Sequence, residues 1–207
     1  MKKVCLVILG VAFTLVLNAQ VRYGVKAGGT LSNVFMSIEG QKESGNMKIG
    51  VQAGGLLEYS FSESFALQPE LLYVLNGTSD KEEGVEMTMS FHNIQLPINL
   101  KYKIGADNLK FYATAGPYLG YIAAGRAKAS TSANGVNASA SMDIFATPLK
   151  EELQLKRFDF GVGVGLGVEI SKMLIGVGYQ FGLANLTGAT GASLKTGTFN
   201  LSIGYFF

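Results

Sequence analysis

Tryptophan is absent from this 207-residue chain, and cysteine and histidine each occur only once. The single cysteine, Cys5, lies in the apolar segment at the start of the sequence. If that segment is removed during export, the mature chain has no thiol, which excludes disulfides and cysteine-based metal sites. Charged residues form only 15% of the chain and neither sign dominates, so nucleic acid is not an expected partner.

Long hydrophobic runs are also scarce, and the only candidate is Val4–Leu17. It follows two lysines and leads to the small residue Ala19, which is the pattern of a secretory signal peptide. The run is shorter than the roughly 20 residues that a membrane-spanning helix needs. We therefore predict a signal peptide at Met1–Ala19, cleaved before Gln20. Without its two lysines, Lys+Arg falls from 17 to 15, equal to the 15 Asp+Glu, and no net charge remains.

Glycine, by contrast, is abundant at 27 residues, and it follows a strict pattern in Phe158–Leu183. Large apolar residues occupy every second position of this segment, with glycine or polar residues between them. A period of two predicts two β-strands joined as a hairpin at Ser171-Lys172. The interior of an eight-stranded barrel has room for glycine and a few polar groups, but not for many bulky side chains. The bulky face should therefore point outward into lipid, because soluble proteins do not expose so large a continuous apolar surface to water.

The same alternation recurs along the mature chain and predicts an all-β fold, an eight-stranded antiparallel up-and-down transmembrane β-barrel over residues 20–207. The expected strands are Val21–Ser32, Met47–Tyr59, Phe65–Leu75, Val85–Lys103, Leu109–Ala123, Phe158–Ile170, Met173–Leu183 and Leu194–Phe207. Long loops are expected at Asn33–Asn46, Asn76–Gly84, Ala124–Arg157 and Ala184–Ser193, alternating with short turns. Since short turns face the periplasm in such barrels, both termini should lie on the periplasmic side.

Two features interrupt the alternation. Pro69 cannot donate a hydrogen bond to a neighbouring strand, so it either demotes its strand or marks a bulge. In Val85–Lys103 the outward residues change from odd-numbered ones, such as Phe91, to even-numbered ones, such as Ile94. A β-bulge near His92-Asn93 would keep both groups on the lipid side.

Charged residues fall on the inward positions of the expected strands. They are Arg22, Lys26, Lys48, Glu58, Glu70, Lys101, Lys103, Lys110, Asp159 and Glu169. Because a buried charge must be paired, these mixed signs favour a packed, non-conducting lumen over a pore or a merely solvated face. We expect a polar network of Arg22, Lys26, Glu70, Lys101 and Glu169. Loss of either acid, Glu70 or Glu169, should leave a cation unpaired.

Two groupings invite a chemical interpretation. The glycines of Gly161–Gly167 differ from a dinucleotide-binding fingerprint, which requires glycine where Leu166 stands and a helix afterwards. Ser90 and His92 share a strand face, and a lipid-deacylating triad of serine, histidine and a carboxylate would need such a pair. A polar strand rim explains the two residues equally simply. We therefore expect no enzyme activity, no cofactor and no metal site.

At the level of short motifs, the chain resembles the PorT-like family of outer-membrane β-barrels. The resemblance rests on YGVKAGGTLSN (Tyr23–Asn33), LQPELLY (Leu67–Tyr73), IQLPINLKYKI (Ile94–Ile104), AGPYLGY (Ala115–Tyr121), GVGVGLGVEI (Gly161–Ile170) and GYFF (Gly204–Phe207). It implies an eight-stranded barrel but no single activity, and one known member assists a protein-secretion apparatus. Tyr205 and Phe207 also resemble the C-terminal signal that the barrel-assembly machinery reads, although lipid-facing aromatics would look the same.

These expectations combine into one functional hypothesis. The protein would be a small barrel in the bacterial cell outer membrane, with lipid and the barrel-assembly machinery as partners and a structural or interaction role. The loop Ala124–Arg157 would either bind an extracellular ligand or simply be solvated. The alternatives are an accessory of a secretion apparatus, a narrow channel and a lipid-modifying enzyme.

Overall fold

The computed structural model describes residues 20–38, 41–44, 46–82, 85–106, 108–133, 136–145, 156–188 and 192–207. The predicted signal peptide lies outside these residues. The described chain forms ten β-strands: β1 (Gln20–Ile38), β2 (Gln41–Ser44), β3 (Asn46–Ser60), β4 (Phe65–Glu82), β5 (Val85–Ala106), β6 (Leu109–Ala133), β7 (Val136–Asp143), β8 (Phe158–Ile170), β9 (Met173–Gly182) and β10 (Ala192–Phe206). No helix among the described residues is long and apolar enough to cross a membrane.

Eight of these strands form a closed ring. Consecutive ring strands pair antiparallel in the order β1, β3, β4, β5, β6, β8, β9 and β10. The pairing of β1 with β10, from Gly24↔Phe206 to Ile38↔Ala192, closes the ring. The predicted eight-stranded antiparallel barrel is confirmed. The two remaining strands, β2 and β7, pair only with the ends of β1 and β6 among the described residues.

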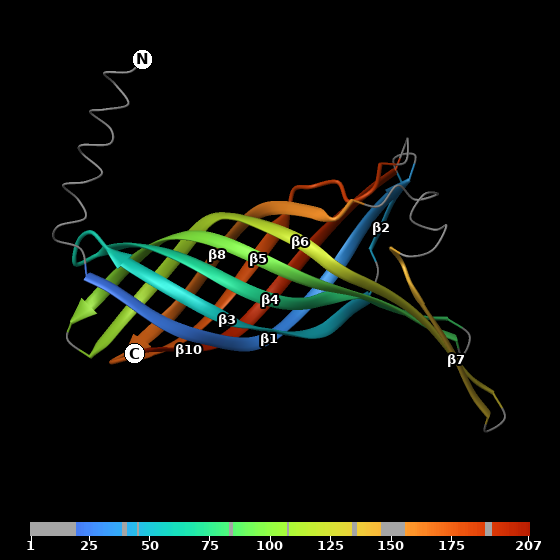
Figure 1. Cartoon of the computed structure of the whole chain (residues 1–207), viewed down its shortest axis with the longest axis horizontal. Helices are drawn as coiled ribbons and strands as arrows, with labels where there is room; N and C mark the ends of the chain where they lie inside the picture. Colours follow the sequence, from blue (N-terminus) through green and yellow to red (C-terminus); the bar gives the residue numbers. More distant parts are fainter. Residues whose placement is uncertain are drawn as a thin grey trace, which may run out of the picture.

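The two ends of the barrel differ in their connections (Figure 1). Short turns join β3 to β4, β5 to β6 and β8 to β9, and the C-terminus lies at this end, here called the turn end. The opposite end, here called the loop end, carries β2 and β7, which extend away from the barrel on different sides. The turn between β8 and β9 contains Ser171 with a φ of 54°, a left-handed conformation that lets a very short connection reverse the chain.

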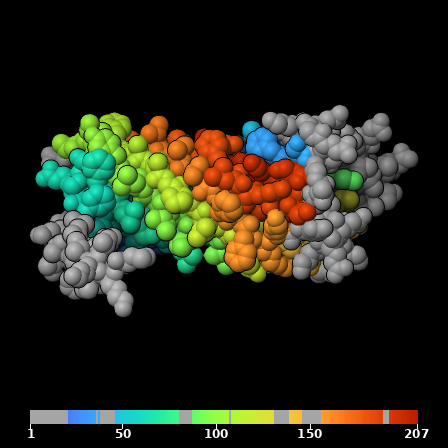
Figure 2. All heavy atoms as spheres, turned by 90° about the horizontal axis from the view of Figure 1, so that it is seen from above, coloured from blue at the N-terminus to red at the C-terminus, as the bar shows by residue number. Residues whose placement is uncertain are grey.

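The outer surface of the barrel is apolar, as the alternation predicts. In β8, the outward side chain of Val164 is 50% exposed, whereas the inward side chain of Asp159 on the same strand is 3% exposed. Exposed Leu, Val, Ile, Phe and Tyr side chains recur on every ring strand. In the space-filling view, the atoms of successive strands form a continuous wall along the barrel (Figure 2).

Several strands continue beyond their predicted ends, so three predicted loops are partly wrong. β1 continues to Ile38, β4 continues to Glu82, and β6 continues to Ala133 before β7 returns beside it. These segments therefore lie in strands where loops were expected at Asn33–Asn46, Asn76–Gly84 and Ala124–Arg157. The continuations of β4 and β6 consist mostly of small and polar residues, which suit a sheet that is wet on at least one face and which a search for apolar alternation overlooks.

The predicted irregularity at His92-Asn93 exists, but its geometry differs from the prediction. His92 pairs with Ala124 and Asn93 pairs with Ile122, so the extra residue is Ala123 in β6. Since β5 itself has no inserted residue, Phe91 stays on the inward side, where it is only 5% exposed. The prediction that Phe91 faces lipid is therefore wrong.

Pro69 neither demotes its strand nor marks a bulge. The β4–β5 register is the same at Leu67↔Leu100 and at Pro69↔Ile98. On the other side of β4, no pair joins β3 and β4 between Leu56↔Glu70 and Tyr59↔Leu67, next to the residue that lacks an N–H.

The polarity of the sheet reverses at the bulge opposite His92. Within the barrel, β6 presents Leu119 and Tyr121 to the outside. Beyond the bulge the outward positions of β6 carry Arg126 and Lys128, both exposed. The apolar residues there lie on the inward side of the sheet instead. The apolar belt of the barrel therefore ends at this level.

Candidate functional site

A group of five charges, four of them buried and Arg22 partly buried, closes the lumen at the turn end. This basal cluster consists of Arg22, Glu58, Lys101, Lys103 and Glu169. Glu58 accepts hydrogen bonds from Arg22 at 2.5 Å, from Lys101 at 2.7 Å and from Lys103 at 2.8 Å. Glu169 accepts from Arg22 at 2.7 Å and from Lys101 at 3.1 Å. The side chains of Glu58 and Lys101 are fully buried, so each charge depends on its partners in place of water.

Aromatic rings support the cations of the basal cluster. The Arg22 guanidinium lies 4.1 Å from the centroid of the Phe206 ring, and the Lys101 ammonium lies 4.5 Å from that of Tyr112. Phe206 is completely buried with Leu56 and Leu174, beside the charges. Because Arg22 is on β1 and Phe206 is on β10, this contact forms across the seam where the ring closes.

Among the predicted network residues, Arg22, Lys101 and Glu169 lie in the basal cluster, while Lys26 and Glu70 form a separate pair. Lys26 Nζ donates to Glu70 at 2.8 Å, and Gln68 Nε2 donates to the other carboxylate oxygen at 2.6 Å. Glu58 was expected to face inward but was not singled out as a site residue, although it holds the most ion pairs. Alternation predicts which positions face inward, but it does not predict which of the inward charges form ion pairs with one another.

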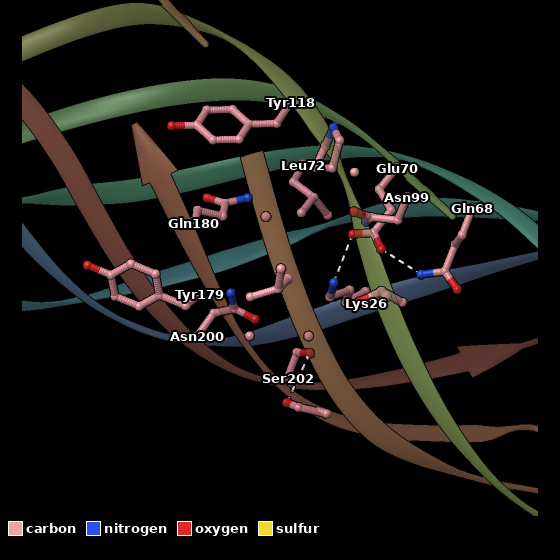
Figure 3. A pocket seen from close by; sticks show the side chains of 18 of the residues that line it. Lys26, Gln68, Glu70, Leu72, Asn99, Tyr118, Tyr179, Gln180, Asn200 and Ser202 are labelled. Carbon is pink, nitrogen blue, oxygen red and sulfur yellow. Dashed lines mark hydrogen bonds and ion pairs between the residues drawn. The ribbon is translucent and has the colours of Figure 1, made fainter. Parts of the chain in front are cut away.

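A small polar cavity of about 60 Å³ lies in the lumen beyond the Lys26–Glu70 pair (Figure 3). It is lined by polar side chains that include Gln52, Gln68, Asn99, Tyr118, Gln180 and Asn200. Gln52 Nε2 and Gln68 Oε1 are buried and have no protein partner. Since a water needs on the order of 10–15 Å³ and a few polar partners, this cavity suits a few water molecules.

The inward glycines make room for tyrosines in the narrow lumen. A side chain at Gly167 or Gly176 would overlap the ring of Tyr112, and one at Gly161 would overlap Tyr118. The glycine-rich repeat therefore has a packing explanation. Leu166, at the position where a dinucleotide fingerprint requires glycine, is exposed on the outer surface.

A second closure, at the loop end, is apolar. This apolar plug consists of Val34, Phe91, Ile122, Ile144, Phe145, Ala184, Leu186 and Leu194. Arg157 contacts two members of the apolar plug. Its guanidinium donates a hydrogen bond to the carbonyl of Ile122 at 3.0 Å and lies 4.1 Å from the centroid of the Phe145 ring. The polar cavity is thus bounded by charges at one end and by apolar side chains at the other.

The structure does not assemble a triad around His92. His92 Nδ1 shares a hydrogen bond of 2.5 Å with the hydroxyl of Tyr73 on the outer surface. Ser90 accepts a hydrogen bond from Lys48. Within the part of the chain that the structure describes, no group of three or more His, Cys, Asp and Glu could hold a metal ion.

The two C-terminal aromatics of the predicted assembly signal lie on the outer surface at the turn end. Tyr205 and Phe207 are both exposed, and their rings contact each other edge to face at 5.8 Å. The backbone N–H of Phe207 donates to the carbonyl of Tyr23 at 2.9 Å, across the seam between β10 and β1. Both rings are therefore accessible at the end of the last strand.

A closed, lipid-facing ring with a filled lumen defines a small transmembrane β-barrel. Residues 17–188 match the family model described as outer membrane protein beta-barrel domain, and the chain belongs to this family. It is a protein of the bacterial outer membrane. A comparison with curated proteins gave no significant match.

Among solved structures, the chain is similar to Ail of Yersinia pestis at 16% identity and a TM-score of 0.46, covering 91% of this chain and 99% of Ail. It is also similar to Neisserial surface protein A at 14% identity and a TM-score of 0.45, covering 89% of this chain and 97% of that one. For OprG of Pseudomonas aeruginosa the identity is 10% and the TM-score is 0.46, with 90% and 95% covered.

Proposed function

We propose that this protein is a closed anchor in the outer membrane that presents a rigid sheet outside the bilayer for binding another macromolecule. The observation that carries the proposal is the projecting sheet, defined as residues 76–82, 85–91, 124–133 and 136–143 of β4, β5, β6 and β7. It begins where the apolar belt ends. Loop ends of such barrels face the exterior, so the projecting sheet would be displayed on the cell surface.

One face of the projecting sheet is apolar although it lies beyond the lipid-facing belt. Met89, Ala127 and Met142 form one row across β5, β6 and β7, and Met87, Ala129 and Ala140 form the next. Met87 is 62% exposed and Met142 is 49% exposed. Exposed apolar patches outside a membrane indicate interaction surfaces, and methionine adapts its shape to a partner. A loop that is merely solvated would need neither an exposed apolar face nor methionines on it.

The closed lumen supports an anchoring role over transport. An ion crossing it would have to displace both the basal cluster and the apolar plug. Opening the basal cluster would break several buried ion pairs at once, and each broken pair leaves an uncompensated charge. We propose a non-conducting barrel on this basis, and a non-catalytic one because the Ser90 and His92 side chains bond to Lys48 and Tyr73.

A second candidate function, accessory to a protein-secretion apparatus, rests on the PorT-like motifs alone. Such a partner would act from the periplasm and should contact the turn end, where Ser62 and Glu63 are exposed. Cleavage before Gln20 and recognition of Tyr205 and Phe207 by the barrel-assembly machinery are parts of the same proposal. The accessible rings of these two residues support the latter.

Site-specific photo-cross-linking in living cells separates the two functions. A photoreactive amino acid at Ala140 probes the projecting sheet, one at Ser62 probes the turn end, and one at Leu119 in the lipid belt is the control. We expect protein adducts from position 140, against lipid adducts from position 119. Adducts with secretion components from position 62 alone would favour the accessory role. Steady conductance steps of the purified barrel in planar bilayers would contradict the closed lumen.

A further inference from the structure

β7 differs from the ring strands in having one open edge. Every ring strand has two neighbours, whereas β7 pairs only with β6 among the described residues. The N–H of Ile144 donates to the carbonyl of Gly125 at 2.9 Å, and this bond continues the register of Ala127↔Met142. Alternate residues bond to the same neighbour in antiparallel sheets, so the backbone groups of Ser139 and Ser141 point to the open edge.

Among the residues that the structure describes, this edge lacks the devices that normally protect an edge strand. Natural edges are blunted by lysine, proline, inward charges or a covering segment. The sequence of β7 contains no lysine and no proline, and its one charge, Asp143, accepts a hydrogen bond from the N–H of Phe145 at 2.8 Å. An unprotected edge outside the membrane is a template for an added strand.

We propose that β7 accepts an extended segment of another polypeptide as an additional antiparallel strand of the projecting sheet. This inference rests on the proposed function and names its partner class. A second copy of this chain fits less well. Two barrels in one membrane are related by an axis along the membrane normal, which keeps the component of both β7 strands along the normal pointing the same way. The two strands could therefore not pair as ideal antiparallel neighbours unless β7 lay in the plane of the membrane, and parallel pairing is less favourable.

The side chains around β7 specify the chemistry of the added strand. Ala140, Ser139 and Ser141 are small and exposed, so they leave room for large side chains on the neighbouring strand. On the face of Met142, the partner should carry β-branched or aromatic residues. On the other face Lys128 lies directly opposite Ser141, so a carboxylate of the partner can approach Lys128 over the small serine. The preferred segment therefore alternates large apolar with acidic or polar residues.

The test uses the full mature chain in phospholipid nanodiscs and a fluorescent octapeptide in which isoleucine and valine alternate with glutamate and threonine. A peptide of the same composition, with its apolar residues contiguous, is the sequence control. The double variant Ser139→Pro, Ser141→Pro removes the N–H groups that face the open edge without removing a bond to β6. The matched variant Ser139→Ala, Ser141→Ala keeps these groups.

Fluorescence anisotropy should show that the prolines weaken binding at least about tenfold, as expected for the loss of two ladder hydrogen bonds, while the alanines change it less than about twofold. Hydrogen exchange at Ser139 and Ser141 should slow when the peptide binds. Unchanged protection of the Ile144 N–H in the proline variant shows that β7 remains paired.

Equal affinity of the proline variant, absence of protection at Ser139 and Ser141, or no binding of the alternating peptide overturns strand addition. If Met142→Ser abolishes binding and the prolines do not, the projecting sheet binds through its apolar face, so the proposed function stands and strand addition fails. A two-barrel complex that forms without peptide and is lost with the prolines would overturn the choice of a foreign strand.

Discussion

The barrel wall and the projecting sheet are built largely from the same strands, yet they expose opposite faces. In the wall, β6 turns Leu119 and Tyr121 outward and keeps Tyr118 inside. Beyond the bulge at Ala123, the same strand turns Arg126 and Lys128 outward. A β-sheet has no preferred face of its own, so the surroundings decide which face must be apolar. The reversal therefore places the boundary of the bilayer at the bulge.

The largest expected effect concerns the basal cluster. Glu58→Gln leaves Arg22, Lys101 and Lys103 without the carboxylate that they share. Removing one partner from a buried ion pair costs about 3–5 kcal/mol, so the free energy of unfolding should fall by this amount. Urea unfolding of the refolded barrel in micelles measures it. Glu63→Gln, in an exposed turn, is the control, and equal losses for both variants would contradict a network of buried ion pairs around Glu58.

The next effect tests which face of the wall meets lipid. Val164→Arg places a charge near the middle of the outer surface and should cost about 2–4 kcal/mol. Ser139→Arg, in the projecting sheet, should cost close to nothing because that segment lies in water. Both are measured by unfolding in lipid vesicles. Similar costs at the two sites would remove the distinction between wall and projecting sheet.

A smaller effect separates inward from outward glycines. Gly167→Ala places a methyl group against the Tyr112 ring and should destabilise the barrel by about 1–3 kcal/mol. Gly29→Ala is the matched control, because nothing lies within 4 Å of a side chain added there. The thermal unfolding midpoint in detergent compares the two variants. A neutral Gly167→Ala would mean that the lumen is less tightly packed than its geometry implies.

The smallest effect falls at the boundary between the two regions. His92→Ala removes the hydrogen bond to Tyr73 and should cost about 0.5–1.5 kcal/mol, with no chemical consequence. Mass spectrometry of the cell-envelope lipids should show the same acylation pattern with the wild-type protein and with the variant. A change in acyl chain number would revive the lipid-modifying hypothesis.

Most of the barrel wall was predictable because its signal is local. Alternation in Phe158–Leu183 fixes two strands and their outward faces without reference to any other segment. The parts of the projecting sheet in β6 and β7 have no such signal, because Ala, Ser and Thr dominate the end of β6 and much of β7. The direction of Phe91 was predicted wrongly for a related reason. The extra residue, Ala123, is followed by Ala124 and Gly125, whose small side chains hide the change of phase.

The candidate site was predictable only in part. Inward charges follow from alternation, but the stagger between strands decides which of them meet. Glu58 became the shared partner because Lys101 and Lys103 reach it across β4 from β5, and no pattern within one strand contains that information. The open edge of β7 likewise depends on pairing and not on composition.

The sequence by itself determined the number of barrel strands, the face of each that is apolar and the inward placement of the charges, because these depend on residues two positions apart. The tertiary structure alone decided the ring closure, the ion pairs across the lumen and the height at which the wall gives way to the projecting sheet. Arg22 and Glu169, for example, lie 147 residues apart in the sequence and meet only because β1 and β8 belong to one closed ring.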